Sequence, residues 1–367
     1  MVLSLPEAVH HLVVGADSDG ELARAESGVA AVTVLSSLTR SVRPPKDLAA
    51  ALALARITRR GRYDVVVTHQ SKAGVLVRAV ASRRTPVVQS LSMASFGPGY
   101  PPVERFLFRC VERVLVRRSA AVCAAGADLA SRFVALGVPS ERVHVVRSGI
   151  PLPTALGERS ALRQRLHDEN EVPQDRPLVL YLGSLERRKN VALLPDLVAG
   201  LAAMTGLEPF LLVLGEGPER PVVCDRLRAL RLQDDAALLG HVTDPDRVLD
   251  ALRAADVLVL LSSAEGLPQV LVQAAAVGTP FVAFDVEGVA EMLRLGAVGE
   301  AVALGDLPAA VQAAARVLTS VDRHREPSAE LSSWRPESVR QEYRSVLGAV
   351  LAHGGPPPAY LRVPGRP

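Results

Sequence analysis

The chain has 367 residues, of which 49% are hydrophobic, 4% aromatic and 22% charged, so its length favours two globular domains with sizeable cores. Its three cysteines, Cys110, Cys123 and Cys224, are too few and too scattered for a disulfide framework or a metal cluster, which indicates a reducing compartment. No apolar run approaches the roughly 20 residues of a membrane span, and the start MVLSLPEAVHHL lacks the long apolar core of a signal peptide. A cytoplasmic protein is therefore expected.

The net charge of +3 is unevenly distributed along the chain. Residues 1–150 hold 20 of the 42 Lys and Arg and 11 of the 39 Asp and Glu, a net charge of +9, so the remainder carries −6. Such a basic half favours an anionic partner, such as a phospholipid surface or a phosphorylated substrate. A basic but merely solvated surface explains the excess equally well. Nucleic acid is not expected as a partner.

The first half alternates short apolar runs, which predict buried strands, with longer segments of helical periodicity. Strands are expected at 11–14, 31–35, 63–68, 86–91, 120–124 and 143–146, and helices at 21–27, 47–60, 75–82, 102–118 and 127–136. A Gly- and Pro-rich loop, 92–102, follows the fourth of these strands. Loops of this kind often form the edge of a binding site.

The expected helix 102–118 carries a single basic stripe, because four arginines recur at i, i+4 spacing: Arg105, Arg109, Arg113 and Arg117. One interpretation is contact with an anionic lipid or with a phosphate of the acceptor. The other is a solvated helix face whose charge is moderated by Glu104 and Glu112. Membrane contact is favoured for the stripe as a whole, because it lies in the basic half, and the solvated face for any single arginine.

Pro151 and Pro153 interrupt the alternation and mark a boundary between domains 1–152 and 153–351. Strands are then expected at 178–182, 210–214, 237–239, 257–261 and 280–284, and helices at 162–166, 191–204, before 230, 245–254, 269–277, 308–318 and 336–351. Two successive βαβ arrays predict an α/β protein with two Rossmann-like, doubly wound domains that face each other across a cleft. The last helix, 336–351, could pack back on the first domain, and the Pro-rich tail 352–367 is expected to be disordered.

The segment 256–291 is the strongest candidate for a binding site. Within it, an apolar strand leads through a polar loop to Pro268, where a helix begins, and this helix ends at Gly278. The helix start presents free N–H groups and the positive end of the helix dipole, which suit a phosphate. Glu265 lies in the loop, at the carboxyl end of a strand, where open α/β sheets bind ligands. This carboxylate could accept hydrogen bonds from sugar hydroxyls or simply act as an acidic helix cap.

A second candidate follows the expected strand 178–182, where Lys189 has Arg187 and Arg188 beside it. A cationic loop at the carboxyl end of a strand can neutralise a diphosphate leaving group, although an ordinary solvated basic turn has the same composition. The sequence has no GxSxG, HExxH or Walker signature, and its eight histidines are scattered, so no metal site is expected.

The order of five segments in the second half resembles glycosyltransferase family 4: GSLERRKN, VLGEGPER, LLGHV, EGLPQVLVQAAAVGTPFVA and EGVAE. In the first half, VVVTHQSKAG and RVHVVRSGI also resemble stretches of that family. The resemblance implies a retaining enzyme of the GT-B fold that acts in bacterial cell-surface polysaccharide biosynthesis. It further implies a nucleotide-diphosphate sugar donor, a lipid-linked, polysaccharide or small-molecule acceptor, no obligatory metal or cofactor, and a cytoplasmic location that can include the inner face of the plasma membrane.

The resemblance also implies roles for particular residues. By matching position, Glu265 corresponds to the first Glu of the family's E-x7-E motif, which contacts hydroxyls of the donor sugar, and Lys189 to its phosphate-binding Lys. Val242 corresponds to the position where the family's backbone meets the nucleotide base. The loop that cradles the phosphates corresponds to Gly266, Leu267 and Pro268. In such enzymes the donor phosphate itself is thought to deprotonate the acceptor, so the protein supplies position and charge.

Several positions depart from the family pattern. The second Glu of the motif, which holds the ribose hydroxyls, is Gln273, and the Arg usually paired with the Lys is Ser184, so Arg187 or Arg188 would have to substitute. In VVQSLSMASF, two His and a Gly of the family are replaced by Gln89, Ser92 and Met93. The residues implied on the acceptor side are His69, Lys72, Gln89 and Phe96.

The family also has a first βα unit that is not found before the strand 11–14. Either the start codon is called too late, or the amino-terminal sheet lacks its central strand. These departures motivate an alternative function: a catalytically impaired GT-B protein that binds nucleotide or partners an active transferase. A third hypothesis is an epimerase of the UDP-N-acetylglucosamine type. It has less support, because the first half shows no acid/base set of carboxylates and histidines.

Overall fold

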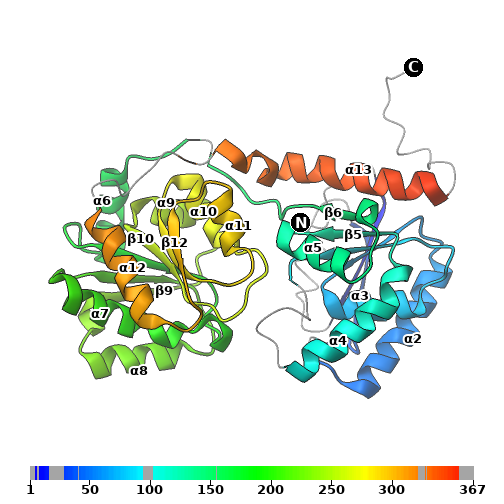
Figure 1. Ribbon diagram of the computed structural model, residues 1–367, viewed down its shortest axis with the longest axis horizontal. Coiled ribbons are helices and arrows are strands. Elements are labelled where there is room, and N and C mark those ends of the chain that lie inside the picture. The colour runs from blue at the N-terminus through cyan, green and yellow to red at the C-terminus, as the bar shows by residue number, and fades with distance from the viewer. Residues whose placement is uncertain are drawn as a thin grey trace. The chain divides into compact units, whose positions relative to one another are not determined.

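The computed structural model describes residue 5 and residues 8–15, 29–39, 41–93, 102–153, 155–320, 327 and 329–354. The chain divides into two compact units, one made of residues 1–149 and 336–367, the other of residues 150–335. Both units are α/β with parallel strands, which agrees with the predicted fold class (Figure 1). The expected helix 21–27, Phe96 and the tail after residue 354 lie outside the described residues.

The second unit (150–335) is built on a six-stranded parallel sheet of order β12-β11-β10-β7-β8-β9. Its strands are β7 (Leu178–Leu182), β8 (Phe210–Leu214), β9 (Ala236–Gly240), β10 (Val257–Leu260), β11 (Phe281–Phe284) and β12 (Gly299–Val302). The chain therefore starts in the middle with β7, runs outward to β9, and returns to place β10 on the other side of β7. Such a reversal of strand order is a topological switch point, and its carboxyl edge is where doubly wound sheets bind ligands.

Helices cover both faces of this sheet (Figure 1). Alternate residues of β7 face opposite sides: Leu178 and Leu180 lie in one core cluster, and Val179 and Tyr181 in the other. A strand buried on both faces reads as a continuous apolar run, which is why the sequence predicted it correctly. The helices are α6 (Arg159–Asn170), α7 (Leu194–Thr205), α8 (Arg220–Leu230), α9 (Pro245–Ala254), α10 (Gln269–Val277), α11 (Val289–Arg294) and α12 (Leu307–Thr319). Short 3₁₀ turns are η3 (Arg187–Lys189), η4 (Val191–Leu193), η5 (Gln233–Asp235) and η6 (Ala329–Trp334).

The first unit contains two parallel sheets. Strand β1 (His10–Gly15) pairs with β2 (Val29–Leu35), and β3 (Val66–His69), β4 (Val87–Leu91), β5 (Ala121–Ala124) and β6 (Val143–Val145) pair in chain order. Among the described residues, no backbone ladder joins the two sheets. The helices are α2 (Pro44–Arg60), α3 (Ser71–Val80), α4 (Pro102–Leu115) and α5 (Ala127–Ala135), with 3₁₀ turns η1 (Val116–Arg118) and η2 (Ser140–Arg142).

The last helix, α13 (Pro336–Gly354), belongs to the first unit although it follows the second in sequence. Its Val339, Val346 and Leu347 pack in one apolar cluster with Val88 and Cys123 of the four-stranded sheet. No helix in the described part of the chain is both long enough and apolar enough to cross a membrane.

Candidate functional site

Two loops meet at the switch point of the second unit, one after β7 and the other after β10. The backbone N–H of Ser263 donates to the Arg188 carbonyl oxygen at 2.8 Å, and the Ser263 hydroxyl donates to the same oxygen at 2.9 Å. The Asn190 side-chain amide donates to the Leu261 carbonyl oxygen at 2.9 Å. These bonds hold the loops at a fixed spacing, so side chains 76 residues apart in sequence, Lys189 and Glu265, come together.

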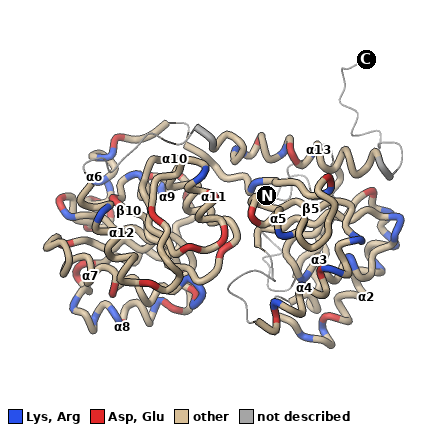
Figure 2. The backbone as a smooth tube through the Cα atoms, in the orientation of Figure 1, with Lys and Arg blue, Asp and Glu red and all other residues tan. Residues whose placement is uncertain are grey.

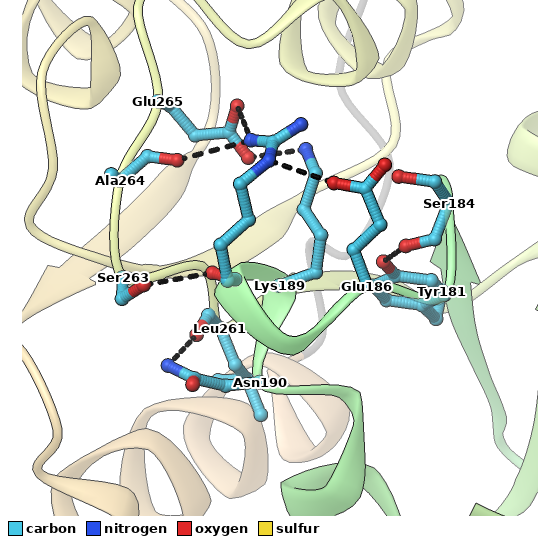
Figure 3. Close-up of polar contacts among 10 residues, drawn as sticks. Tyr181, Ser184, Glu186, Lys189, Asn190, Leu261, Ser263, Ala264 and Glu265 are labelled. Carbon is cyan, nitrogen blue, oxygen red and sulfur yellow. Dashed lines mark hydrogen bonds and ion pairs between the residues drawn. The ribbon is translucent and has the colours of Figure 1, made fainter. Parts of the chain in front are cut away.

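The centre of the site is an ion pair between Lys189 and Glu265 (Figure 3). The Lys189 ammonium donates to Glu265 Oε1, and the Arg188 guanidinium Nη1 lies 3.6 Å from Glu265 Oε2. The side chains of Lys189 and Glu265 are only 15% and 10% exposed, so their charges are shielded from bulk water. The carboxylate predicted to bind a sugar and the ammonium predicted to bind a phosphate are therefore neighbours in one small polar centre.

Arg188 is oriented toward this centre and Arg187 is not. The Arg188 guanidinium donates to the Ala264 carbonyl oxygen at 3.3 Å and to Glu186 Oε2 at 3.0 Å. Arg187 is exposed, whereas Arg188 is partly buried. Of the two arginines that the sequence offered as substitutes for the family Arg at position 184, Arg188 is the one that reaches this centre, and its role toward a donor stays a prediction.

Tyr181 supports the site from the end of β7. Its hydroxyl donates to the Ser184 carbonyl oxygen at 2.9 Å, so position 184 contributes its backbone to this loop. Burial raises the pKa of the Tyr181 phenol, and the nearby negative charge of Glu265 raises it further. The phenol therefore stays protonated and serves as a hydrogen-bond donor rather than as a base.

The GEGP turn after β8 packs directly beneath the loop that follows β7. A Cβ atom on Gly215 would lie 1.8 Å from the Gly183 carbonyl oxygen, and one on Gly217 would lie 2.5 Å from the Leu185 carbonyl oxygen. Glycine is required at both positions because the two backbones touch. In the sequence this turn is part of the segment VLGEGPER, and its contact shows that it shapes the loop that carries Lys189.

The start of α10 completes the same edge of the sheet. Gly266, Leu267 and Pro268 form the turn that leads into this helix, and no side chain caps its first N–H groups. A Cβ atom on Gly288 would lie 2.5 Å from the Gly266 carbonyl oxygen, so the following EGVAE segment packs closely against this turn. Gln273 lies further along α10 and is partly buried.

Val242 follows β9, whose carboxyl end lies at the same sheet edge. It is partly buried and packs against the core cluster beneath that edge. Except for Gln273, which lies within α10, the predicted donor-side residues therefore come from loops and a helix start at the carboxyl edge of this sheet. Within the described ranges, no three His, Cys, Asp or Glu side chains are grouped so that they could hold a metal ion.

The residues predicted on the acceptor side lie in the first unit. His69 ends β3, and burial lowers the pKa of its imidazole, which favours the neutral ring. Lys72 is held by its own unit: its ammonium lies 2.5 Å from Asp47 Oδ1 and donates to the carbonyl oxygens of Thr39 and Ser41 at 2.8 and 2.5 Å. This network occupies the Lys72 donors, so any contact with an acceptor would require them to be released.

Gln89 is fully buried in β4, and its side-chain amide has no hydrogen-bond partner within the described part of the chain. A Cβ atom on Gly74 would lie 2.7 Å from its Nε2, which shows how closely α3 covers the amide. The roles of His69, Lys72 and Gln89 toward an acceptor stay predictions.

Sequence reasoning missed Asn190 and Ser263, which bond the two loops to each other, and Tyr181, which bonds within the loop after β7. Each bonds to a backbone carbonyl whose position depends on the tertiary fold. Asn190 was visible only as the last letter of the GSLERRKN segment, without a partner to give it a role.

Comparison with known proteins places each unit in a family. Residues 163–330 match the family model described as glycosyl transferases group 1, and residues 1–149 match the glycosyl transferase 4-like domain. The D-inositol 3-phosphate glycosyltransferase of Xylanimonas cellulosilytica is 31% identical over 245 residues, which cover 62% of this chain and 57% of that relative. The N-acetyl-alpha-D-glucosaminyl L-malate synthase of Bacillus anthracis is 24% identical over 311 residues, which cover 82% of this chain and 76% of that relative.

Solved structures show the same fold. The structure of HepE from Anabaena in complex with UDP and glucose superposes with a TM-score of 0.67 at 17% identity, covering 92% of this chain and 91% of that chain. At this level of identity the likeness concerns the fold alone.

Proposed function

Because this chain belongs to the GT-B glycosyltransferases of the family 4 type, we propose that it transfers a sugar from a nucleotide-diphosphate sugar to an acceptor hydroxyl with retention of configuration. The observation that carries the proposal is the partly buried Lys189–Glu265 pair at the switch point of the second unit. An ammonium and a guanidinium lie there beside Glu265, and the uncapped start of α10 follows in the same loop, a combination that suits a diphosphate. A carboxylate beside them suits the hydroxyls of the attached sugar.

In the proposed reaction, Lys189 and Arg188 hold the diphosphate and stabilise the charge that develops as the glycosidic bond breaks. The diphosphate competes with Glu265 for the Lys189 ammonium, and this exchange frees one carboxylate oxygen to accept a hydrogen bond from the sugar. An oxygen of the leaving phosphate takes the proton of the acceptor hydroxyl, so no protein base is required. Glu265, through the carboxylate oxygen freed in this way, serves to position the sugar.

The acceptor is proposed as a lipid-linked sugar, a polysaccharide or a small molecule. Two relatives are named for small anionic acceptors, an inositol phosphate and malate. The first unit holds 24 of the 42 Lys and Arg and 13 of the 39 Asp and Glu, a net charge of +11, which would favour an anionic acceptor. That no metal is obligatory, and that Arg105, Arg109, Arg113 and Arg117 contact an anionic membrane, stay predictions.

The test is a panel of UDP-, GDP- and dTDP-sugars, with donor hydrolysis and transfer followed by mass spectrometry and donor binding by calorimetry. We expect one donor to bind and to turn over, and Glu265→Ala to weaken both. The anomeric configuration of the product, read by NMR, must match that of the donor.

A specific observation keeps the non-catalytic alternative in view: Gln273 and Ser184 replace two donor-binding residues of the family pattern. This alternative predicts nucleotide binding that is unaffected by Glu265→Ala and accompanied by no hydrolysis or transfer of any donor. That result would contradict the proposed reaction.

A further inference from the structure

Helix α4 has an apolar face that is exposed to solvent. Its side chains are among the most exposed large hydrophobic residues of the described chain: Val103 at 70%, Phe106 at 67%, Leu107 at 57%, Val111 at 38% and Val114 at 73%. Spacings of three and four residues place them on one side of the helix, together with the exposed Cys110. An amphipathic helix of a globular unit normally buries such a face, so this exposure requires an explanation.

The reason for the exposure is that α4 docks on its unit by the opposite, polar side. Glu112 is 2% exposed and lies 2.7 Å from the fully buried Arg78 of α3. At about 100° per residue, Glu112 is on the far side of the helix from Phe106, Cys110 and Val114. The expectation that Glu112 would moderate an exposed basic stripe is therefore wrong, because the Glu112 carboxylate is buried in an ion pair with Arg78.

The exposed apolar face has a basic border. Arg109 and Arg113 are exposed and lie along one edge of it, and Arg117 and Arg118 follow at the carboxyl end of the helix. The basic positions along α4 are blue in Figure 2. An apolar stripe beside a row of cations is the pattern of helices that lie in the interface of a bilayer, with apolar side chains among the acyl chains and cations at the headgroups.

We propose that α4 docks this protein on an anionic lipid bilayer by inserting the apolar face formed by Val103, Phe106, Leu107, Cys110, Val111 and Val114. Charge complementarity favours a bilayer over a second copy of the chain. An antiparallel pairing of two α4 helices about a two-fold axis would place the arginine border of one beside that of the other. The first units of the two copies, each with a net charge of +11, would add to that repulsion, whereas anionic headgroups relieve it.

The test is flotation of the full chain with vesicles of phosphatidylcholine alone and of phosphatidylcholine mixed with phosphatidylglycerol. We expect binding to the anionic vesicles only. The double variant Phe106→Ser/Leu107→Ser should bind about a hundredfold more weakly, because each lost apolar insertion is worth about tenfold. Arg109→Gln/Arg113→Gln should weaken binding by about tenfold or more and flatten its salt dependence.

The matched control is Met204→Ser/Leu304→Ser, which removes two large side chains of similar exposure, 52% and 53%, from the second unit. It should bind like the unchanged protein. All of these side chains are exposed, so thermal melts should coincide. No turnover is needed in this experiment, so its failure is distinguishable from failure of the proposed reaction.

Cys110 lies on this apolar face, so a label on its thiol reports whether lipid or a second copy of the chain covers the face. In a Cys224→Ser background, a polarity-sensitive fluorophore on Cys110 should shift to the blue when anionic vesicles are added, because Cys123 is buried and unreactive. Two results would overturn the proposal. One is a vesicle assay in which the unchanged protein does not bind anionic vesicles, or in which Phe106→Ser/Leu107→Ser binds them as tightly as the unchanged protein. The other is efficient cross-linking of Cys110 between copies in lipid-free solution, abolished by the same variant, which would assign the face to a second copy.

Discussion

Comparing Arg188→Ala with Arg187→Ala tests whether the arginine that reaches the polar centre contributes more to donor use than its exposed neighbour. Both changes remove one guanidinium from the same 3₁₀ turn, η3, so any effect of net charge on the protein is matched. Only Arg188 reaches the polar centre, where its Nη1 lies 3.6 Å from Glu265 Oε2. We expect Arg188→Ala to impair donor use strongly and Arg187→Ala to leave it within about twofold, the scale of an ordinary surface change.

The magnitude follows from the contacts and exposure of Arg188. A charge-assisted hydrogen bond to a phosphate oxygen contributes about 1.5–3 kcal/mol. Because the Arg188 side chain is 38% exposed, solvent screens it, and the much larger energy of a dry ion pair does not apply. The expected loss of kcat/KM is therefore about ten- to hundredfold.

The assay is steady-state turnover of the identified donor, with donor affinity measured by calorimetry on the same preparations. A loss in kcat that exceeds the loss in affinity would indicate that Arg188 stabilises the departing diphosphate more than the bound donor. Equal losses for Arg187→Ala and Arg188→Ala would refute the assignment. So would a fall in melting temperature for Arg188→Ala large enough to account for the lost activity.

Three further outcomes are expected. Glu265→Gln, which keeps the shape but removes the negative charge, should lower kcat/KM by about a hundredfold with an unchanged fold, measured on the same donor; an unchanged rate would exclude a sugar contact. Glu112→Gln should destabilise the first unit by about 3–5 kcal/mol in urea unfolding, because it leaves the Arg78 guanidinium buried without its counter-charge, whereas the double change Arg78→Met/Glu112→Leu should cost much less. If the single change proves neutral, the pair does not anchor α4. Burial raises the pKa of the Cys123 thiol to about 12 from its ordinary 9.0, so the folded state keeps a proton that the unfolded state loses, and stability should fall between those two pH values by about 1.4 kcal/mol per unit. The Cys123→Ala variant should show a flatter fall with pH in thermal melts, and parallel curves would contradict the reasoning.

Local sequence patterns were sufficient for much of the second unit. Strands such as β7 and β10 are buried on both faces, so they appear as uninterrupted apolar runs, and α10 is delimited by Pro268 and Gly278. Strand β12 and helix α11 were missed, because both are short and the apolar residues of Gly299–Val302 are interrupted by Glu300. The packing of α13 on the first unit was left open, since a helix pattern does not name its partner.

The sequence by itself determined the type of protein and the loops that form the candidate site, because motif order and strand ends are local properties of the chain. Only the tertiary structure decided which charges meet. It paired Lys189 with Glu265, selected Arg188 over Arg187, and turned the apolar side of α4 outward by burying Glu112 against Arg78. The physical reason is that electrostatic and hydrophobic energies depend on distance and burial, and the chain sets neither until its distant segments have packed together.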